Sequence, residues 1–315
     1  MKDTNMTTMT KNSTRLSRRA FLGTMVAGAG LIGLPFSLRA APAAAGAAIA
    51  FDGDALILAG DTLSRSDGSG GWMELSAPAA GGIISLATHP ARPGRIAAGL
   101  AGGGIALSED GGDGWEARSQ GLPDAPVTAV TVAAAVPDTI YAAIHGDGLW
   151  KSEDAGRSWA LAMDRPWLAD AERDVTALAS VDLATGMGGI WIYAGTELGL
   201  TRVPDCFCRW QDVQPGDAMD ALVSGNPAPS EAPLPEGMIH GLASAASLPT
   251  RLYAALPSGI WKSQDAGVVW SQISGTSALA VAVHPTNADQ VVAITGDGLV
   301  ESRDGGANWT ALARA

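Results

Sequence analysis

The stretch Ser152-Glu153-Asp154-Ala155-Gly156-Arg157-Ser158-Trp159 decides the fold, because its pattern recurs along the chain. The skeleton S-x-D-x-G-x-x-W, called the box below, occurs in full four times, and two partial copies keep the Asp and the Trp five residues later. Successive box Trp residues lie 39 to 60 positions apart, which indicates a repeat architecture. The full boxes are Ser108, Asp110, Gly112 and Trp115; Ser152, Asp154, Gly156 and Trp159; Ser263, Asp265, Gly267 and Trp270; and Ser302, Asp304, Gly306 and Trp309. The partial boxes are Asp67 with Trp72, and Asp205 with Trp210.

The segments around each box are typical of short β-strands. Runs such as 139–143 and 251–255 lie upstream of their boxes, and 148–152 leads directly into one. Four short strands per unit, joined by Gly- and Pro-rich turns, form the blade of a β-propeller. We therefore predict an all-β fold, a six-bladed propeller of four-stranded antiparallel blades. The expected blades are 47–76, 83–122, 127–163, 175–213, 238–274 and 278–313.

A seventh blade would require a degenerate unit within 214–237. That stretch is rich in Pro, Ala, Gly and acidic residues, and it is predicted to be a loop.

The box residues are predicted to be structural. The Asp carboxylate and the Ser hydroxyl can hydrogen-bond the turn backbone. The Gly permits a positive φ, and the Trp can bury its rings along the blade edge.

The boxes resemble the Asp-box (BNR) repeats of sialidases, xyloglucanase-type glycosidases, sortilin-like receptors and photosystem II assembly-factor propellers. The resemblance covers essentially all of residues 46–315 and implies the propeller fold. It also implies that the box turns share one face of the ring and that function belongs to the opposite face. It implies no single activity, because these families share the box and differ in function.

The N-terminal segment is predicted to be an export signal. Ser17-Arg18-Arg19-Ala20-Phe21-Leu22 resembles the twin-arginine signal, with Arg18 and Arg19 as its arginine pair. A Gly- and Ala-rich stretch and small residues suited to signal peptidase follow. Glycine and proline within 20–38 disfavour the alternative of a membrane anchor. We expect removal of residues 1–45, leaving a periplasmic propeller over 46–315 with no membrane span.

The charge of the expected mature protein excludes one class of partner. Residues 1–43 hold six of the twenty Lys and Arg and one of the 32 acids, which leaves 14 basic and 31 acidic residues and a formal charge of −17. Such a protein is repelled by phosphate backbones, so no nucleic acid partner is expected. A cation or a basic protein surface is compatible with it.

Binding residues are expected in the connectors between blades. The two longest connectors are 164–174 and 214–237, and long loops on a rigid scaffold are where binding residues gather. The binding candidates are Trp167, Asp170, Glu172, Arg173, Asp174, His145 and His240.

Catalysis would need carboxylates from the turns on the same face. Asp147, Glu197 and Asp297 are the candidates for a general acid/base pair or for a bound cation. Their Gly-Asp-Gly contexts at 146–148 and 296–298 also suit plain tight turns. Tyr141, Tyr193 and Tyr253 occupy one equivalent strand position, so they are repeat residues and not nucleophiles of a sialidase. No cofactor and no protein metal site are predicted.

The only cysteines form the sequence Cys206-Phe207-Cys208 within the fourth, partial box. Such a pair can form a disulfide, remain as thiols or bind a soft metal. A structural disulfide is the favoured interpretation.

These observations rank two functions. The first is a non-enzymatic periplasmic propeller that binds another protein as an interaction or assembly factor. The alternative is a glycoside hydrolase that uses paired carboxylates on the face opposite the boxes. The expected partner is accordingly a periplasmic protein or a glycan.

Overall fold

The structure is a computed structural model that describes residues 47–68, 70–79, 81–183, 189–213 and 232–313. The chain divides into two compact units, Met1–Pro42 and Ala43–Ala315, and every described residue belongs to the second. The described residues form strands and turns without a helix. Among them there is accordingly no helix long and apolar enough to cross a membrane. The predicted signal peptide, residues 1–45, lies outside the described ranges.

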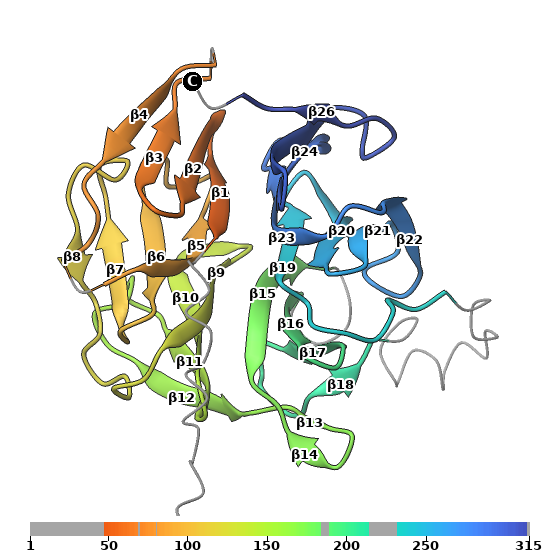
Figure 1. Ribbon diagram of the computed structural model, residues 1–315. Helices are drawn as coiled ribbons and strands as arrows, with labels where there is room; N and C mark the ends of the chain where they lie inside the picture. Colours follow the sequence, from red (N-terminus) through yellow and green to blue (C-terminus); the bar gives the residue numbers. More distant parts are fainter. Residues whose placement is uncertain (1–46, 69, 80, 184–188, 214–231, 314–315) are drawn as a thin grey trace, which may run out of the picture. The chain divides into compact units, whose positions relative to one another are not determined.

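Six antiparallel sheets of four strands each make up the described part of the second unit (Figure 1). The four strands of a sheet follow one another along the chain, so each sheet is a blade folded from one continuous segment. Blades 1 to 3 contain β1 (Ala48–Asp52), β2 (Ala55–Ala59), β3 (Leu63–Ser66) and β4 (Trp72–Leu75); β5 (Ile83–Thr88), β6 (Ile96–Leu100), β7 (Ile105–Ser108) and β8 (Glu116–Ala117); and β9 (Val127–Ala133), β10 (Val136–Ile144), β11 (Gly148–Ser152) and β12 (Ala160–Asp164). Blades 4 to 6 contain β15 (Val175–Asp182), β16 (Ile190–Thr196), β17 (Leu200–Pro204) and β18 (Gln211–Asp212); β19 (Gly241–Ala245), β20 (Leu248–Leu256), β21 (Gly259–Ser263) and β22 (Trp270–Ser274); and β23 (Ala278–His284), β24 (Asn287–Thr295), β25 (Gly298–Ser302) and β26 (Thr310–Ala311).

The blades form a closed ring around their first strands. Each first strand contacts the first strand of the next blade, and β1 contacts β23, which closes the ring. The prediction of a six-bladed propeller is confirmed. Residues 232–237 of the predicted loop hold no strand, and 214–231 lie outside the described residues.

The ring closes without exchange of a strand between its first and last blades, because β26 completes blade 6 from its own segment. Side chains join the two blades instead. The indole Nε1 of Trp72 donates to the carbonyl of Ala313 at 3.3 Å. His284 Nε2 and Asp54 Oδ1 lie 2.9 Å apart. An apolar cluster that includes Leu58 and Leu299 fills the space between the blades.

The antiparallel strand order defines two faces of the ring. The turns between first and second strands and those between third and fourth strands lie on one face, called the box face. The turns between second and third strands, together with the connectors between blades, lie on the other, called the connector face. All six boxes occupy turns between third and fourth strands.

The four full boxes repeat one hydrogen-bond pattern. In blade 3 the Ser152 hydroxyl donates to Asp154 Oδ1 at 2.8 Å and accepts the N–H of Gly156 at 2.8 Å. Asp154 Oδ1 also accepts the N–H of Ser158 at 2.9 Å. The boxes of blades 2, 5 and 6 make the same bonds. Because they satisfy turn donors that lack a strand partner, these bonds fix the turn.

The box Trp residues link neighbouring blades. Trp159 Nε1 donates to the carbonyl of Arg118 in blade 2 at 2.7 Å. Trp270 differs, since its Nε1 donates to Gly267 within its own turn. The other indoles reach the preceding blade as Trp159 does: Trp115 bonds Ser76, Trp210 bonds Asp164, Trp309 bonds Ile273, and Trp72 bonds Ala313 across the closing seam.

The buried Tyr hydroxyls link blades in the opposite direction. Tyr141 OH donates to Asp205 Oδ1 in the following blade at 2.6 Å. Tyr193 and Tyr253 donate to the carbonyls of Ala266 and Ala288, each also in the following blade. All three side chains are fully buried. They therefore serve the blade interfaces.

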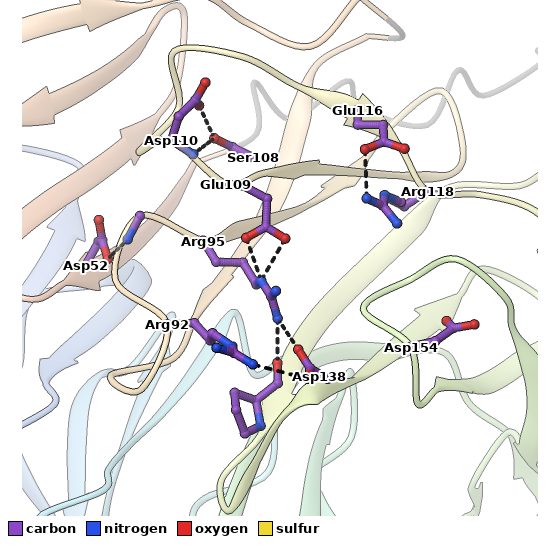
Figure 2. A network of polar contacts seen from close by, with 12 residues as sticks. Asp52, Arg92, Arg95, Ser108, Glu109, Asp110, Glu116, Arg118, Asp138 and Asp154 are labelled. Carbon is purple, nitrogen blue, oxygen red and sulfur yellow. Dashed lines mark hydrogen bonds and ion pairs between the residues drawn. The ribbon is translucent and has the colours of Figure 1, made fainter.

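An ion network joins blades 2 and 3 on the box face (Figure 2). Arg95 lies between Glu109, at 3.0 Å, and Asp138, at 2.5 Å, and Arg92 also reaches Asp138. Burial lowers the pKa of Arg95, but its hydrogen bonds to Glu109 and Asp138 outweigh burial and raise it. The bond from Arg95 in turn lowers the pKa of Asp138. Charges on this face are thus engaged in holding blades together.

Candidate functional site

The connector between blades 3 and 4 folds into a small hairpin of its own. Strand β13 (Trp167–Leu168) pairs with β14 (Ala171–Glu172), Trp167 facing Glu172. Its two turn residues, Ala169 and Asp170, have φ of 48° and 62°. Positive φ at both central residues is the geometry of a tight two-residue hairpin turn, which Asn and Gly adopt most easily. The segment 165–174 is called the Trp167 hairpin below.

One flank of the hairpin is held by Arg165. Its guanidinium contacts Glu172 at 2.5 Å and Asp174 at 3.3 Å. Asp174 also pairs with His145 Nδ1 at 2.9 Å and accepts the N–H of Gly146 at 2.9 Å. Burial by itself lowers the pKa of Arg165. The hydrogen bonds to Glu172 and Asp174 outweigh burial, so the pKa of Arg165 is raised. These contacts tie the hairpin to the turn between β10 and β11.

The other flank is held by Arg173. Its Nη1 contacts Glu197 at 2.8 Å, in the turn between β16 and β17. Its Nε donates to the carbonyl of Leu168 at 3.2 Å. The hairpin is therefore braced against turns of both blades that it connects.

Trp167 lies on this braced hairpin with 66% of its surface exposed, the largest fraction among the exposed large apolar side chains of the described residues. Other exposed apolar side chains at the connector-face ends of their segments are Met238 (42%) and Leu279 (44%). A Trp side chain buries on the order of 150–250 Å² when covered, so leaving one exposed on a fixed support is costly unless something covers it.

The structure brings six of the seven binding candidates together at the Trp167 hairpin and leaves one apart. His145, Glu172, Arg173 and Asp174 hold the hairpin that presents Trp167. Asp170 is exposed at its tip, and its carboxylate makes no hydrogen bond or ion pair with the described residues. His240 is elsewhere, where its Nδ1 lies 2.9 Å from the carbonyl of Ala278 and links blades 5 and 6.

The sequence prediction missed the hairpin and the role of Arg165. The turn Leu168-Ala169-Asp170-Ala171 has no Gly or Asn to mark it, so the segment read as a loop. The signal that could have revealed it is the spacing of charges, with Arg165 seven and nine positions before Glu172 and Asp174.

The three catalytic candidates occupy second-to-third-strand turns of different blades. Asp147, in blade 3, accepts the indole N–H of Trp150 at 2.6 Å. Glu197, in blade 4, is paired with Arg173. Asp297 lines a groove of about 500 Å³ between blades 6 and 1, together with Asp61 and an apolar floor that includes Leu58 and Leu299. The turns that carry Asp147 and Glu197 both brace the Trp167 hairpin, and Asp297 lies in the groove between blades 6 and 1.

Within the described ranges, no three His, Cys, Asp or Glu residues are grouped so that they could bind a metal ion. Two further hollows lie along the ring axis. The larger hollow, of about 240 Å³, opens at the box-face ends of the first strands and is lined mostly by apolar residues, above all Ala and Val. The smaller, of about 70 Å³, lies at their connector-face ends and includes His240 in its lining. Both belong to the central channel of the propeller.

Cys206 and Cys208 form a disulfide in the turn between β17 and β18 of blade 4. Both cysteines are exposed. The intervening Phe207 has a φ of 51° and packs against Tyr141, with ring centroids 5.9 Å apart.

Comparisons with known proteins identify the fold and no family. No family model matches the chain, and no curated protein sequence matches it. Among solved structures, the GH74 xyloglucanase from Xanthomonas campestris matches with a TM-score of 0.54 at 19% identity, over 85% of this chain and 47% of that one. A chain of a nidogen/laminin complex matches with a TM-score of 0.58 at 10% identity, over 83% of this chain and 93% of that one. YCF48 bound to a D1 peptide matches with a TM-score of 0.49 at 15% identity, over 85% and 82% of the two chains.

This chain thus spans about half the length of the xyloglucanase that it resembles. At such low identities the likenesses establish the propeller fold alone.

Proposed function

We propose that this protein is an exported, periplasmic propeller that binds a partner protein through the Trp167 hairpin and catalyses no reaction. The observation that carries the proposal is an exposed Trp on a hairpin that ion pairs hold from both sides. Trp and Arg dominate the energetics of protein interfaces. A platform fixed before binding loses little entropy when a partner docks on it.

The backbone of the hairpin supports the same proposal. Two residues with side chains, Ala169 and Asp170, hold left-handed φ values that cost roughly 1–2 kcal/mol each. Ala155 and Ala266, in the structural box turns, hold similar φ values, so this strain indicates that the surroundings fix the backbone of the hairpin. Here the imposing contacts are the ion pairs of Arg165 and Arg173.

The charges of the hairpin are mostly committed to its own structure. Glu172 and Asp174 pair with Arg165, so reversing their charge would break the hairpin as well as any contact with a partner. Asp170 has no such commitment among the described residues. The change that tests charge attraction is therefore Asp170→Lys. If the partner surface is basic, this change and rising salt should each weaken binding.

The decisive experiment compares the removal of two exposed apolar side chains, Trp167 and Met73. The protein, cross-linked in periplasm, is used to identify a partner, and its affinity is then measured with purified components. Trp167→Ala should weaken the affinity by about 30-fold or more, as expected for a central interface residue. Met73→Ala, which removes a side chain 57% exposed on the outer strand of blade 1, is the matched control and should change nothing.

An unchanged affinity in Trp167→Ala, with the fold intact, would overturn the proposed site. Equal losses in Trp167→Ala and Met73→Ala would show that the capture is unspecific.

A glycosidase remains the rival function, since the xyloglucanase shares the fold. Such an enzyme needs two carboxylates about 5–10 Å apart across a cleft, whereas Asp147 accepts the indole N–H of Trp150 and Glu197 pairs with Arg173. Asp297 is the candidate whose carboxylate has no hydrogen-bond or ion-pair partner in the described part of the chain. Turnover of xyloglucan by the wild type that Asp297→Asn abolishes would establish the rival; no turnover is expected.

A further inference from the structure

The fourth box departs from the repeat where it carries its cysteines. Val203 stands at the position of the box Ser, and Phe207 at that of the box Gly. Cys206 and Cys208 flank Phe207 and form a disulfide whose two residues are both exposed. The repeat supplies an internal control for this bond, because the other five boxes contain no cysteine and still close the same hairpin.

The turn of blade 4 is held by contacts that do not involve sulfur. The N–H of Phe207 donates to the carbonyl of Pro204 at 2.8 Å, and that of Asp205 donates to the carbonyl of Ile190 at 3.0 Å. Asp205 also accepts the hydroxyl of Tyr141 and pairs with Lys151 at 3.2 Å. Phe207 packs against the core of the interface between blades 3 and 4. These contacts keep the turn in place whether the sulfurs are joined or separate.

The disulfide adds little to the stability of the folded chain. It spans a single intervening residue, and a loop that short restricts the unfolded chain far less than the long loops that disulfides usually close. A bond that the fold does not need, between sulfurs that solvent reaches, is open to chemical exchange.

We propose that Cys206 and Cys208 are a reversible thiol–disulfide exchange site whose substrates are accessible thiols. A substrate thiolate attacks Sγ of one cysteine, forming a mixed disulfide, and the electron pair of the broken bond leaves on the other cysteine, which takes a proton from water. A second substrate thiolate then attacks the substrate sulfur of the mixed disulfide and releases the first cysteine as a thiolate. Two thiols are oxidised to one disulfide, and the protein disulfide is reduced to two thiols.

The reduced pair is arranged to re-form its bond. The Cα atoms of Cys206 and Cys208 lie 5.5 Å apart, within the range that disulfides require, and the surrounding contacts hold that spacing. Arg209 follows Cys208 directly, and a nearby positive charge favours the thiolate form of a cysteine. Lys151, the other cation beside this turn, is paired with Asp205 and Glu153.

The first experiment is a redox titration of the full chain. The protein is equilibrated in buffers with stepped ratios of reduced to oxidised glutathione, blocked with a maleimide and weighed by mass spectrometry. We expect the bond to open across the series while the melting temperature of the protein stays within a few degrees of its oxidised value. A bond that opens only when the protein unfolds, or at no ratio, would overturn the proposal.

Single-cysteine variants test whether each sulfur is accessible to exchange, and a peptide dithiol tests the class of substrate. With oxidised glutathione, Cys206→Ser and Cys208→Ser should each form a mixed disulfide, and the double variant should form none. Wild-type protein mixed with a reduced two-cysteine peptide should convert one peptide dithiol to a disulfide per chain. Oxidation of the peptide without glutathione exchange would assign protein thiols as the substrate, and the reverse would assign small thiols.

If neither thiol source exchanges with the folded protein, the disulfide is structural and the proposal fails. The double variant Cys206→Ser/Cys208→Ser guards against misfolding as a cause. Its melting temperature should match that of the wild type, because the sulfur-free contacts hold the turn.

Discussion

The box face and the connector face are formed at opposite ends of the same strands. The box face repeats its contacts from blade to blade, and the connector face has a feature that occurs once. On the box face the same bonds recur from blade to blade, with the Ser hydroxyl 2.8 Å from the Asp carboxylate in all four full boxes. On the connector face, the Trp167 hairpin is the only two-stranded sheet formed by the described residues. A feature that recurs in four of the six blades serves the folding of the blade that carries it. A feature that occurs once is available for something other than folding.

Two tryptophans, one on each face, should show the largest difference in their effect on the free energy of unfolding. Trp159, of the third box, is 8% exposed, and Trp167 is 66% exposed. Trp159→Ala should lower the free energy of unfolding by about 3–5 kcal/mol through the cavity that it leaves. Trp167→Ala should change it by less than about 0.5 kcal/mol. Urea unfolding followed by circular dichroism measures both, and equal losses would end the distinction between the faces.

A smaller loss is expected inside the box itself. Ser152→Ala removes the acceptor of the buried Gly156 N–H and should cost about 1–3 kcal/mol. Ser158→Ala, at an exposed position of the same turn, is the comparison and should cost less, because it removes only the exposed bond from Ser158 Oγ to Asp154 Oδ2 and the backbone N–H of Ser158 still reaches Asp154. The same unfolding measurement applies. A loss in Ser158→Ala as large as that in Ser152→Ala would mean that the turn does not depend on the box serine.

Acid should weaken the box face in particular. Hydrogen bonds from Ser158 hold the pKa of Asp154 at about 2, and bonds from Asn308 do the same for Asp304, against an ordinary value of 3.8. A carboxyl whose pKa is depressed by folding contributes its stability above the ordinary pKa and loses it as the pH falls through the folded value. The melting temperature should therefore fall between pH 4 and pH 2. Asp154→Asn should flatten that fall, whereas a variant with the wild-type slope would contradict the assignment.

The smallest effect is expected on the connector face. Ala169→Gly relieves a left-handed φ of 48° but gives the unfolded chain more freedom, so it should stabilise the protein by no more than about 1 kcal/mol. A shift in melting temperature detects this. A clear loss of stability would show that Ala169 is not strained.

The ring could be predicted from the sequence because its cause is local and repeated. Each full box places a Ser, an Asp, a Gly and a Trp at fixed offsets. The Ser, Asp and Gly act within one turn, and the Trp of three full boxes bonds the preceding blade. The predicted blade segments accordingly agree with the strands to within a few residues at most ends, such as 127–163 against Val127–Asp164.

The candidate site was only half predictable, because its geometry depends on contacts between separate segments. That Arg173 reaches Glu197 from one connector to the next blade cannot be inferred from either segment alone. The contacts of Asp205 could not be inferred either, because the sequence shows it only as the Asp of a partial box. In the structure it accepts Tyr141 and pairs with Lys151 of the preceding blade.

The closing seam has a consequence for how the molecule is made. Its contacts join residues far apart in the sequence, with Trp72 bonded to Ala313, 241 positions away, and Asp54 to His284, 230 positions away. Such contacts form late, because the whole intervening chain must be ordered before they can be made. A ribosome releases blade 1 first, and its flank, including Leu58, stays without its neighbour until blade 6 has left the exit tunnel. A chain truncated before residue 278 would therefore leave two apolar blade edges exposed to solvent. We expect such a chain to aggregate and not to form a smaller ring.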